Sequence, residues 1–140
     1  MAVSKEQLME LYREAVKASA FSYSPYSHFP VGAAILTDDG SVVTGANVEN
    51  RSYGLTNCAE RTAAFKAVSE GRLSFKAIAI AAPKADYPVG PCGACRQVLT
   101  EFADNDTPVI FGSREENVLV HTLGELYPFD SLHELASEKS

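Results

Sequence analysis

The chain has 140 residues, a length typical of one domain, and 46% of them are hydrophobic, as in ordinary globular proteins. Its net charge of −6, from 18 acidic and 12 basic residues, argues against a surface that binds the phosphates of a nucleic acid. No segment approaches the roughly 18 apolar residues that a membrane-spanning helix needs. Charged residues within positions 1–14 exclude a signal peptide, so we expect a cytoplasmic protein whose cysteines stay reduced.

The first half of the chain predicts one helix and a hairpin. Apolar side chains recur at helical spacing over residues 4–20, and Ser4 with Gln7 has the pattern of a capping box. Serines and prolines in the next segment predict a loop. Two short apolar segments, at 31–36 and 42–48, flank a turn and predict two paired strands.

The second half alternates helices with single strands. Helices are expected at 58–70 and 92–103, and strands at 76–82, 108–112 and 117–122. The unbroken apolar segment in the first of these strands indicates burial on both faces. The alternation as a whole predicts an α/β sandwich built around a central sheet.

All three cysteines lie in two short motifs, Cys58-Ala59-Glu60 and Pro91-Cys92-Gly93-Ala94-Cys95. Three thiolates leave a tetrahedral zinc ion one ligand short, and an open position is typical of a catalytic zinc. Each motif begins an expected helix, where backbone N–H groups favour a thiolate over a thiol. We therefore predict one zinc ion per chain, held by Cys58, Cys92 and Cys95.

Charged residues beside the cysteines suit hydrolytic chemistry. Glu60 is close enough to the first ligand to handle the protons of a water, the arrangement of three-cysteine zinc nucleobase deaminases. Three thiolates and one Zn²⁺ leave an excess negative charge, which opposes the activation of that water. Arg61 follows Glu60 and Arg96 follows Cys95, and we predict that both guanidinium groups donate hydrogen bonds to ligand sulfurs.

Other interpretations of these residues stay open. A Cys-x-x-Cys pair suits a redox dithiol, although Cys58 then has no purpose. A structural zinc site needs a fourth ligand, and the histidines, His28, His121 and His133, lack ligand-like spacing to the cysteines. In either case Glu60 would be a surface residue in the first turn of a helix, and the arginines would be solvated.

The two cysteine motifs and three further segments, at 26–34, 45–50 and 52–57, resemble the small zinc-dependent cytidine deaminases. The similarity extends over residues 4–130. It implies a cytidine deaminase domain across 1–140, folded as a three-layer α/β/α sandwich with a mixed five-stranded central sheet. It also implies a homotetramer that acts on a small nucleoside in pyrimidine salvage and binds neither nucleic acid nor membrane.

The resemblance also implies roles for individual residues. Asn47 and Glu49 would bind ribose hydroxyls, Phe29 would pack against the nucleoside, and the backbone of Ala59 would contact the base. An amide and a carboxylate two residues apart at a strand end point the same way, although a solvated hairpin end shows the same pattern. The implied reaction converts cytidine and 2′-deoxycytidine to uridine and 2′-deoxyuridine, with zinc-bound hydroxide attacking C4 and Glu60 shuttling protons.

Two aromatic residues have expected roles between subunits. By the same resemblance, Tyr53 would lie near a subunit interface and support a neighbour's site. The family often carries, three positions after a C-terminal proline, an aromatic that reaches an adjacent pocket. Here Phe129 follows Pro128 directly and Ser131 occupies the spaced position. Either Phe129 takes that role or this part of the pocket differs.

Three rival functions remain. A deaminase of a nucleoside antibiotic such as blasticidin S shares the zinc motifs, although Asn47 and Glu49 favour an intact ribose. A deaminase of polynucleotides is disfavoured by the acidic composition. A non-catalytic zinc protein would keep the cysteines but would have no need of Glu60.

Overall fold

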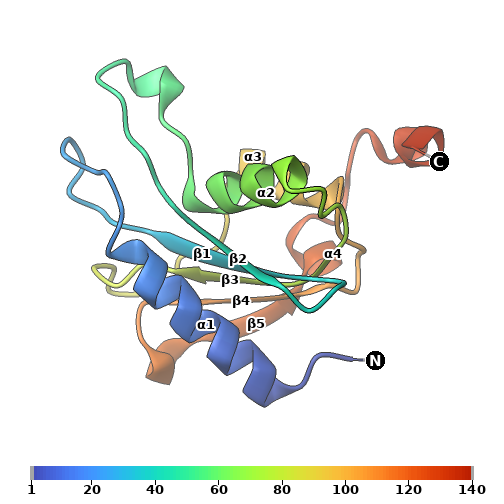
Figure 1. Ribbon diagram of the computed structural model, residues 1–140, viewed down its shortest axis with the longest axis horizontal. Coiled ribbons are helices and arrows are strands. Elements are labelled where there is room, and N and C mark those ends of the chain that lie inside the picture. The colour runs from blue at the N-terminus through green and yellow to red at the C-terminus, as the bar shows by residue number, and fades with distance from the viewer. Residues whose placement is uncertain (1, 140) are drawn as a thin grey trace.

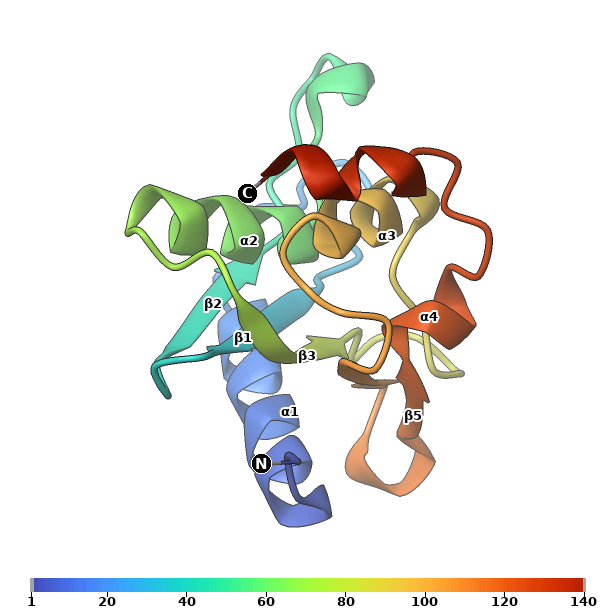
Figure 2. The ribbon, with the colours of Figure 1, turned by 90° about the vertical axis from the view of Figure 1, so that its right-hand side faces the viewer.

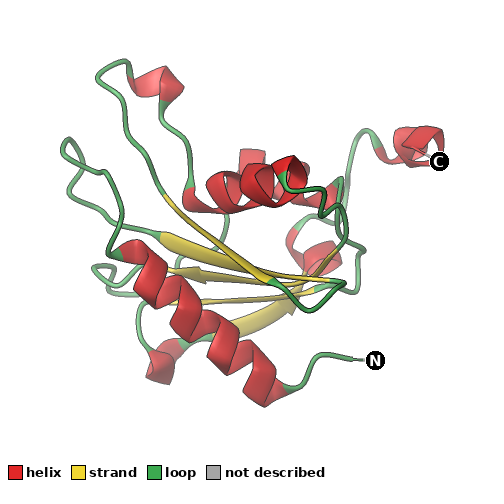
Figure 3. Cartoon of the chain, in the orientation of Figure 1, coloured by secondary structure: helices red, strands yellow, loops and turns green. Residues whose placement is uncertain are grey.

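A five-stranded sheet separates the helices into two layers in the computed structural model, which describes residues 2–139 (Figures 1 and 3). The strands are β1 Gly32–Thr37, β2 Val42–Ala46, β3 Phe75–Ala81, β4 Pro108–Gly112 and β5 Leu119–Thr122. Their order in the sheet is β2-β1-β3-β4-β5, and only β3 and β4 pair in parallel. The predicted mixed five-stranded sheet is therefore confirmed.

Helices cover both faces of the sheet (Figure 2). Helix α1 (Lys5–Ser19) packs on one face, and α2 (Ala59–Ser69) and α3 (Gly93–Thr100) lie on the other. Helix α4 (Leu123–Leu126) is a single turn. The capping box of α1 forms as expected. No helix in the described part of the chain is both long and apolar enough to span a membrane.

Strand β3 is the buried centre of the molecule. Its alanines, Ala77, Ala79 and Ala81, lie in the core cluster with α1, whereas Ile78 and Ile80 belong to the core beneath α2 and α3. The expected burial of this strand on both faces is therefore correct. Small side chains on the α1 side let the helix approach closely, and a Cβ atom at Gly32 would lie only 2.0 Å from the Ala15 carbonyl oxygen.

Helix α2 packs equally closely on strand β2. Ala59, Ala63 and Ala67 are fully buried along one side of the helix. A Cβ atom at Gly45 would lie 2.5 Å from the Ala63 amide nitrogen. Because so little space separates the two backbones, the strand fixes the position of the first turn of α2.

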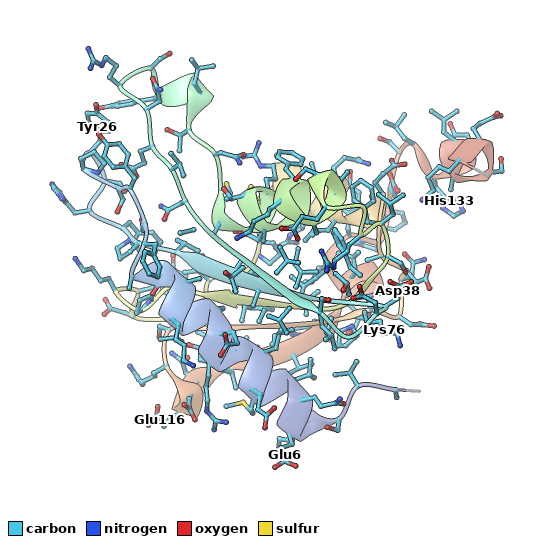
Figure 4. All side chains as sticks on the ribbon, viewed as in Figure 1. Glu6, Tyr26, Asp38, Lys76, Glu116 and His133 are labelled. Atoms are coloured by element: carbon cyan, nitrogen blue, oxygen red, sulfur yellow. The ribbon has the colours of Figure 1, made fainter. Side chains whose placement is uncertain are left out.

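Two loops extend together beyond one end of the sheet, namely residues 20–31 and 47–58 (Figure 1). Isolated bridges join Tyr23 to Val48 and Val48 to Asn57. Figure 4 shows Tyr26 at the outer end of the first loop. The pairing places the serine-rich loop beside Asn47 and Glu49.

Candidate metal centre and active site

The three cysteine sulfurs converge at the N-termini of two helices. Cys58 is the N-cap of α2, Cys92 is the N-cap of α3, and Cys95 lies in the first turn of α3. The Cys58 Sγ lies 3.6 Å from the Cys92 Sγ, which lies 3.2 Å from the Cys95 Sγ. Tetrahedral zinc with Zn–S bonds of about 2.3 Å separates its sulfurs by about 3.8 Å. The donor set therefore fits zinc after small shifts.

The surroundings of Cys58 favour its ionisation. Hydrogen bonding with Cys95, aided by Arg61, lowers the pKa of Cys58 to about 5. The pKa of Cys95 is raised by the same hydrogen bond and by burial, so the proton of this pair stays on Cys95. The Cys95 amide N–H also donates to the Cys92 sulfur at 3.4 Å. This electropositive surrounding is the kind that stabilises metal-binding thiolates.

Arg61 makes the predicted hydrogen bond to a cysteine sulfur. Its Nη2 donates to the Cys58 sulfur at 3.2 Å. The two residues are three positions apart at the start of α2, which puts their side chains on one face. The expected contact is present, and the role of Arg61 in reducing the charge of the centre stays a prediction.

Arg96 does not contact a ligand sulfur, so that part of the prediction is wrong. Its Nε donates to the Pro91 carbonyl oxygen at 2.7 Å, and its Nη1 donates to the Leu126 carbonyl oxygen at 2.6 Å. Successive residues of a helix point roughly 100° apart, which turns Arg96 away from Cys95. Arg96 instead ties the loop before α3 to the C-terminal segment.

No protein side chain provides a fourth ligand within residues 2–139. The one group of possible metal ligands found there contains the three cysteines alone. His133, for example, lies in the C-terminal tail (Figure 4). Cys95 is buried but Cys92 is exposed, so the centre is accessible from one side. These features favour an open catalytic site over a closed structural one.

Glu60 is a buried carboxyl group beside this centre. It lies in the first turn of α2, two residues after Cys58, and is only 4% exposed. Burial raises the pKa of Glu60 to about 7. The alternative of a solvated surface glutamate is therefore excluded, and the group is able to take up and release a proton near neutral pH.

Asn47 is 8% exposed and is held by the neighbouring loop. Its Oδ1 accepts hydrogen bonds from the Ser22 hydroxyl at 2.5 Å and from the Val31 amide at 3.0 Å. Its Nδ2 donates to the Phe29 carbonyl oxygen at 2.9 Å. The amide therefore has both acceptor positions filled and one N–H free.

Glu49 is held in the same way. Its Oε1 accepts from the amides of Tyr26 at 3.0 Å and Ser27 at 3.1 Å, and its Oε2 accepts from the Ser27 hydroxyl. The Ser27 hydroxyl is the largest cause of a lowered pKa at Glu49, so the carboxylate is ionised at neutral pH. A hollow of about 330 Å³ adjoins it, lined by Tyr26, Ser27, Glu49, Tyr53 and Thr56.

The metal centre and the polar pair are linked through the backbone. Val48, between Asn47 and Glu49, exchanges hydrogen bonds with Asn57, which directly precedes Cys58. The hollow beside Glu49 has no cysteine in its lining. One chain thus fixes the two groups relative to each other, although the hollow beside Glu49 does not reach the cysteines.

The aromatic residues expected at subunit contacts are both exposed on this chain. Tyr53 is exposed near the tip of its loop, with its ring centroid 5.9 Å from that of Tyr26. Phe129 is 91% exposed. Tyr127, in contrast, is anchored, because its hydroxyl donates to Gln97 Oε1 at 2.6 Å. The chain therefore presents Phe129 outward from an anchored segment.

Sequence reasoning missed Ser22 and Ser27. The serines in this loop served only to predict that a helix ends there. Their partners, Asn47 and Glu49, are more than twenty residues away, and no local pattern identifies such contacts.

Comparison with known proteins agrees with this geometry. A family model described as "Cytidine and deoxycytidylate deaminase zinc-binding region" matches residues 5–112. A cytidine deaminase of Halalkalibacterium halodurans is 55% identical over 84% of this chain and 89% of the relative. The crystal structure of cytidine deaminase from Burkholderia pseudomallei superposes with a TM-score of 0.82 at 43% identity, over 90% of this chain and 98% of that one.

A blasticidin-S deaminase of Bacillus cereus also matches, but more distantly. It is 33% identical over 70% of this chain and 74% of the relative. The chain is therefore similar to this antibiotic deaminase as well, but the cytidine deaminase of H. halodurans is much more similar in sequence.

The Arg61 contact predicts a specific effect on metal retention. Arg61→Gln should weaken zinc binding by about tenfold or more, because the Cys58 thiolate loses its cationic partner. Competition with a chromophoric chelator measures the affinity. Arg51→Gln is a matched control, since it removes an equal charge from an exposed side chain of the loop. Equal zinc affinity in the two variants would contradict the role of Arg61.

Proposed function

Because the chain belongs to the cytidine and deoxycytidylate deaminase family, we propose that it hydrolyses cytidine and 2′-deoxycytidine to uridine and 2′-deoxyuridine, with release of ammonia. The observation that carries this proposal is the buried Glu60 beside three converging cysteine sulfurs. A closed structural zinc site has no need of a buried proton carrier. A hydrolytic site does need one.

In this proposal Cys58, Cys92 and Cys95 hold the zinc ion, which when bound acts as a Lewis acid and activates water at neutral pH. Glu60 accepts a proton from the attacking water and delivers it to N3 of the pyrimidine ring as C4 becomes tetrahedral. The same carboxylate then takes the proton of the new hydroxyl group on C4 and passes it to the departing amine, which leaves as ammonia as the C4 carbonyl forms. The Ala59 backbone, at the start of α2, contacts the base.

The sugar is bound by the polar pair, with Phe29 packing against the nucleoside. Asn47 has one N–H left to donate, and Glu49, with three hydrogen bonds already accepted, has about one acceptor position left. One donor and one acceptor together suit a single hydroxyl group better than a diol. We therefore propose that the pair binds the ring hydroxyl that cytidine and 2′-deoxycytidine share.

The neighbouring subunit completes the pocket in this proposal. A homotetramer would explain why Tyr53 and Phe129 are exposed and why the hollow beside Glu49 has no cysteine of the same chain in its lining. We assign Phe129, and not the anchored Tyr127, to the pocket of an adjacent subunit. The proposed setting is pyrimidine salvage in the cytoplasm, with no nucleic-acid or membrane partner.

The rival activity on an antibiotic nucleoside is distinguished by substrate. Purified protein should deaminate cytidine and 2′-deoxycytidine, and should leave cytosine, cytidine monophosphate and blasticidin S unchanged. The loss of ultraviolet absorbance as cytosine becomes uracil reports each reaction. Faster turnover of blasticidin S than of cytidine would overturn the proposed substrate class.

Replacement of Glu60 should abolish most of the turnover and leave the fold intact. Glu60→Gln keeps the size of the buried side chain, so the protein should still bind zinc and cytidine while kcat falls by at least about 100-fold. Zinc content and equilibrium binding of cytidine verify that the site is intact. Near-normal turnover in this variant would remove Glu60 from the mechanism.

The assignment of Phe129 predicts an effect across subunits. Phe129→Ala should raise the KM for cytidine several-fold, because the aromatic surface that closes a neighbour's pocket is lost, and zinc content should not change. Phe65→Ala serves as the control, because it removes an exposed phenylalanine from a different element, helix α2. An unchanged KM in Phe129→Ala would show that the C-terminal segment does not line the pocket.

A further inference from the structure

The Ser27 hydroxyl lies between two groups that the proposed function places against the nucleoside. It donates to the Glu49 carboxylate and accepts from the Phe29 backbone amide at 3.1 Å. We propose that Ser27 is a positioning residue that couples the sugar-binding carboxylate to the loop carrying Phe29. This inference rests on the proposed function, because it specifies how that sugar site is held.

In each of these two hydrogen bonds, the donor and the acceptor are determined by chemistry. An ionised carboxylate only accepts hydrogen bonds, so the single hydroxyl proton of Ser27 must point at Glu49. The lone pairs of the hydroxyl oxygen are then free to accept from the Phe29 N–H. A hydrogen bond to a charged acceptor is among the stronger ones in proteins. A shift in the position of the Glu49 carboxylate therefore alters the position of the Phe29 backbone through Ser27, and the reverse also holds.

The backbone between Ser27 and Phe29 is built around this contact. His28 has φ 57°, and it is the only non-glycine residue with positive φ in the described chain. This left-handed conformation is unfavourable for a histidine, so other contacts must hold it. The His28 amide donates to the Ser24 carbonyl oxygen, and the amides of Tyr26 and Ser27 donate to Glu49. The turn that presents Phe29 thus depends on the carboxylate.

Loss of the hydroxyl should affect substrate binding and leave the chemistry intact. Without it, Glu49 Oε2 loses the hydrogen bond that fixes its direction toward the sugar, and the Phe29 amide loses its acceptor. Among residues 2–139, none of the side-chain hydrogen bonds of Cys58, Cys95 or Arg61 involves the loop 20–31. The expected signature is therefore a higher KM with kcat little changed.

The experiment compares Ser27→Ala with Ser27→Thr, which keeps the hydroxyl. Ser27→Ala should raise the KM for cytidine about tenfold, as expected for the loss of a hydrogen bond to a charged group, with kcat within about twofold. Ser27→Thr should stay near the wild-type value. Ser74→Ala is the control, since this exposed serine on the loop before β3 makes no side-chain hydrogen bond among the described residues.

The substrate 2′,3′-dideoxycytidine separates positioning of Glu49 from a general disturbance of the loop. It lacks the ring hydroxyl that Glu49 binds, so Ser27→Ala should raise its KM much less than that of cytidine. An equal rise for both substrates, a fall confined to kcat, or no rescue by Ser27→Thr would each overturn the inference.

Two further controls address a variant that fails to fold and separate this inference from the proposed function. If Ser27→Ala does not fold, Ser27→Cys replaces it, because a thiol of similar size is a weak donor and should give the same rise in KM. Wild-type protein that fails to deaminate cytidine would overturn the proposed function itself. An active wild type with an unaltered Ser27→Ala variant would overturn only the role of Ser27.

Discussion

The close approach of α2 to strand β2 is the constraint on which the rest of the site depends. Gly45 leaves no room for a side chain beneath Ala63, and the alanines of α2 bring the helix backbone close to the sheet. This fixes the first turn of α2, where Cys58, Glu60 and Arg61 lie. Because α3 packs beside α2, its own first turn brings Cys92 and Cys95 to the same point. Small side chains in the core thus determine the geometry of a metal centre at the surface.

The electrostatic consequence is a concentration of negative charge that the protein offsets locally. In α3 the backbone N–H of Cys95 donates to the Cys92 sulfur, and in α2 the Arg61 side chain donates to the Cys58 sulfur. Glu60 shares the same turn but is removed from water, which disfavours its charged form. The arrangement therefore favours the thiolate form of Cys58 and leaves the glutamate able to carry a proton, a division of roles between neighbouring acids that hydrolytic sites commonly require.

Local patterns predicted the features that depend on local structure. The capping box at Ser4, the two cysteine N-caps, the five strands and the two-sided burial of β3 follow from periodicity and helix-start signals. The partners of Arg96 were not predictable, because its guanidinium is captured by the Leu126 carbonyl, thirty residues further along the chain. The serine contacts with Asn47 and Glu49 were missed for the same reason. In each case a long-range backbone arrangement, and not the residue type, selects the partner.

These long-range contacts change the physical interpretation of the proposed sugar site. Asn47 and Glu49 looked like a pair of free polar groups at a strand end, available to a diol. Most of their hydrogen-bonding capacity is in fact used to hold the loop 20–31 against the segment 47–58. Because the Asn47 amide and the Glu49 carboxylate are each held by three hydrogen bonds, they have little freedom to rotate, and the remaining donor and acceptor point in fixed directions before any ligand arrives. Such preorganisation lowers the entropic cost of binding, and it makes selectivity for one hydroxyl a property of the folded loop.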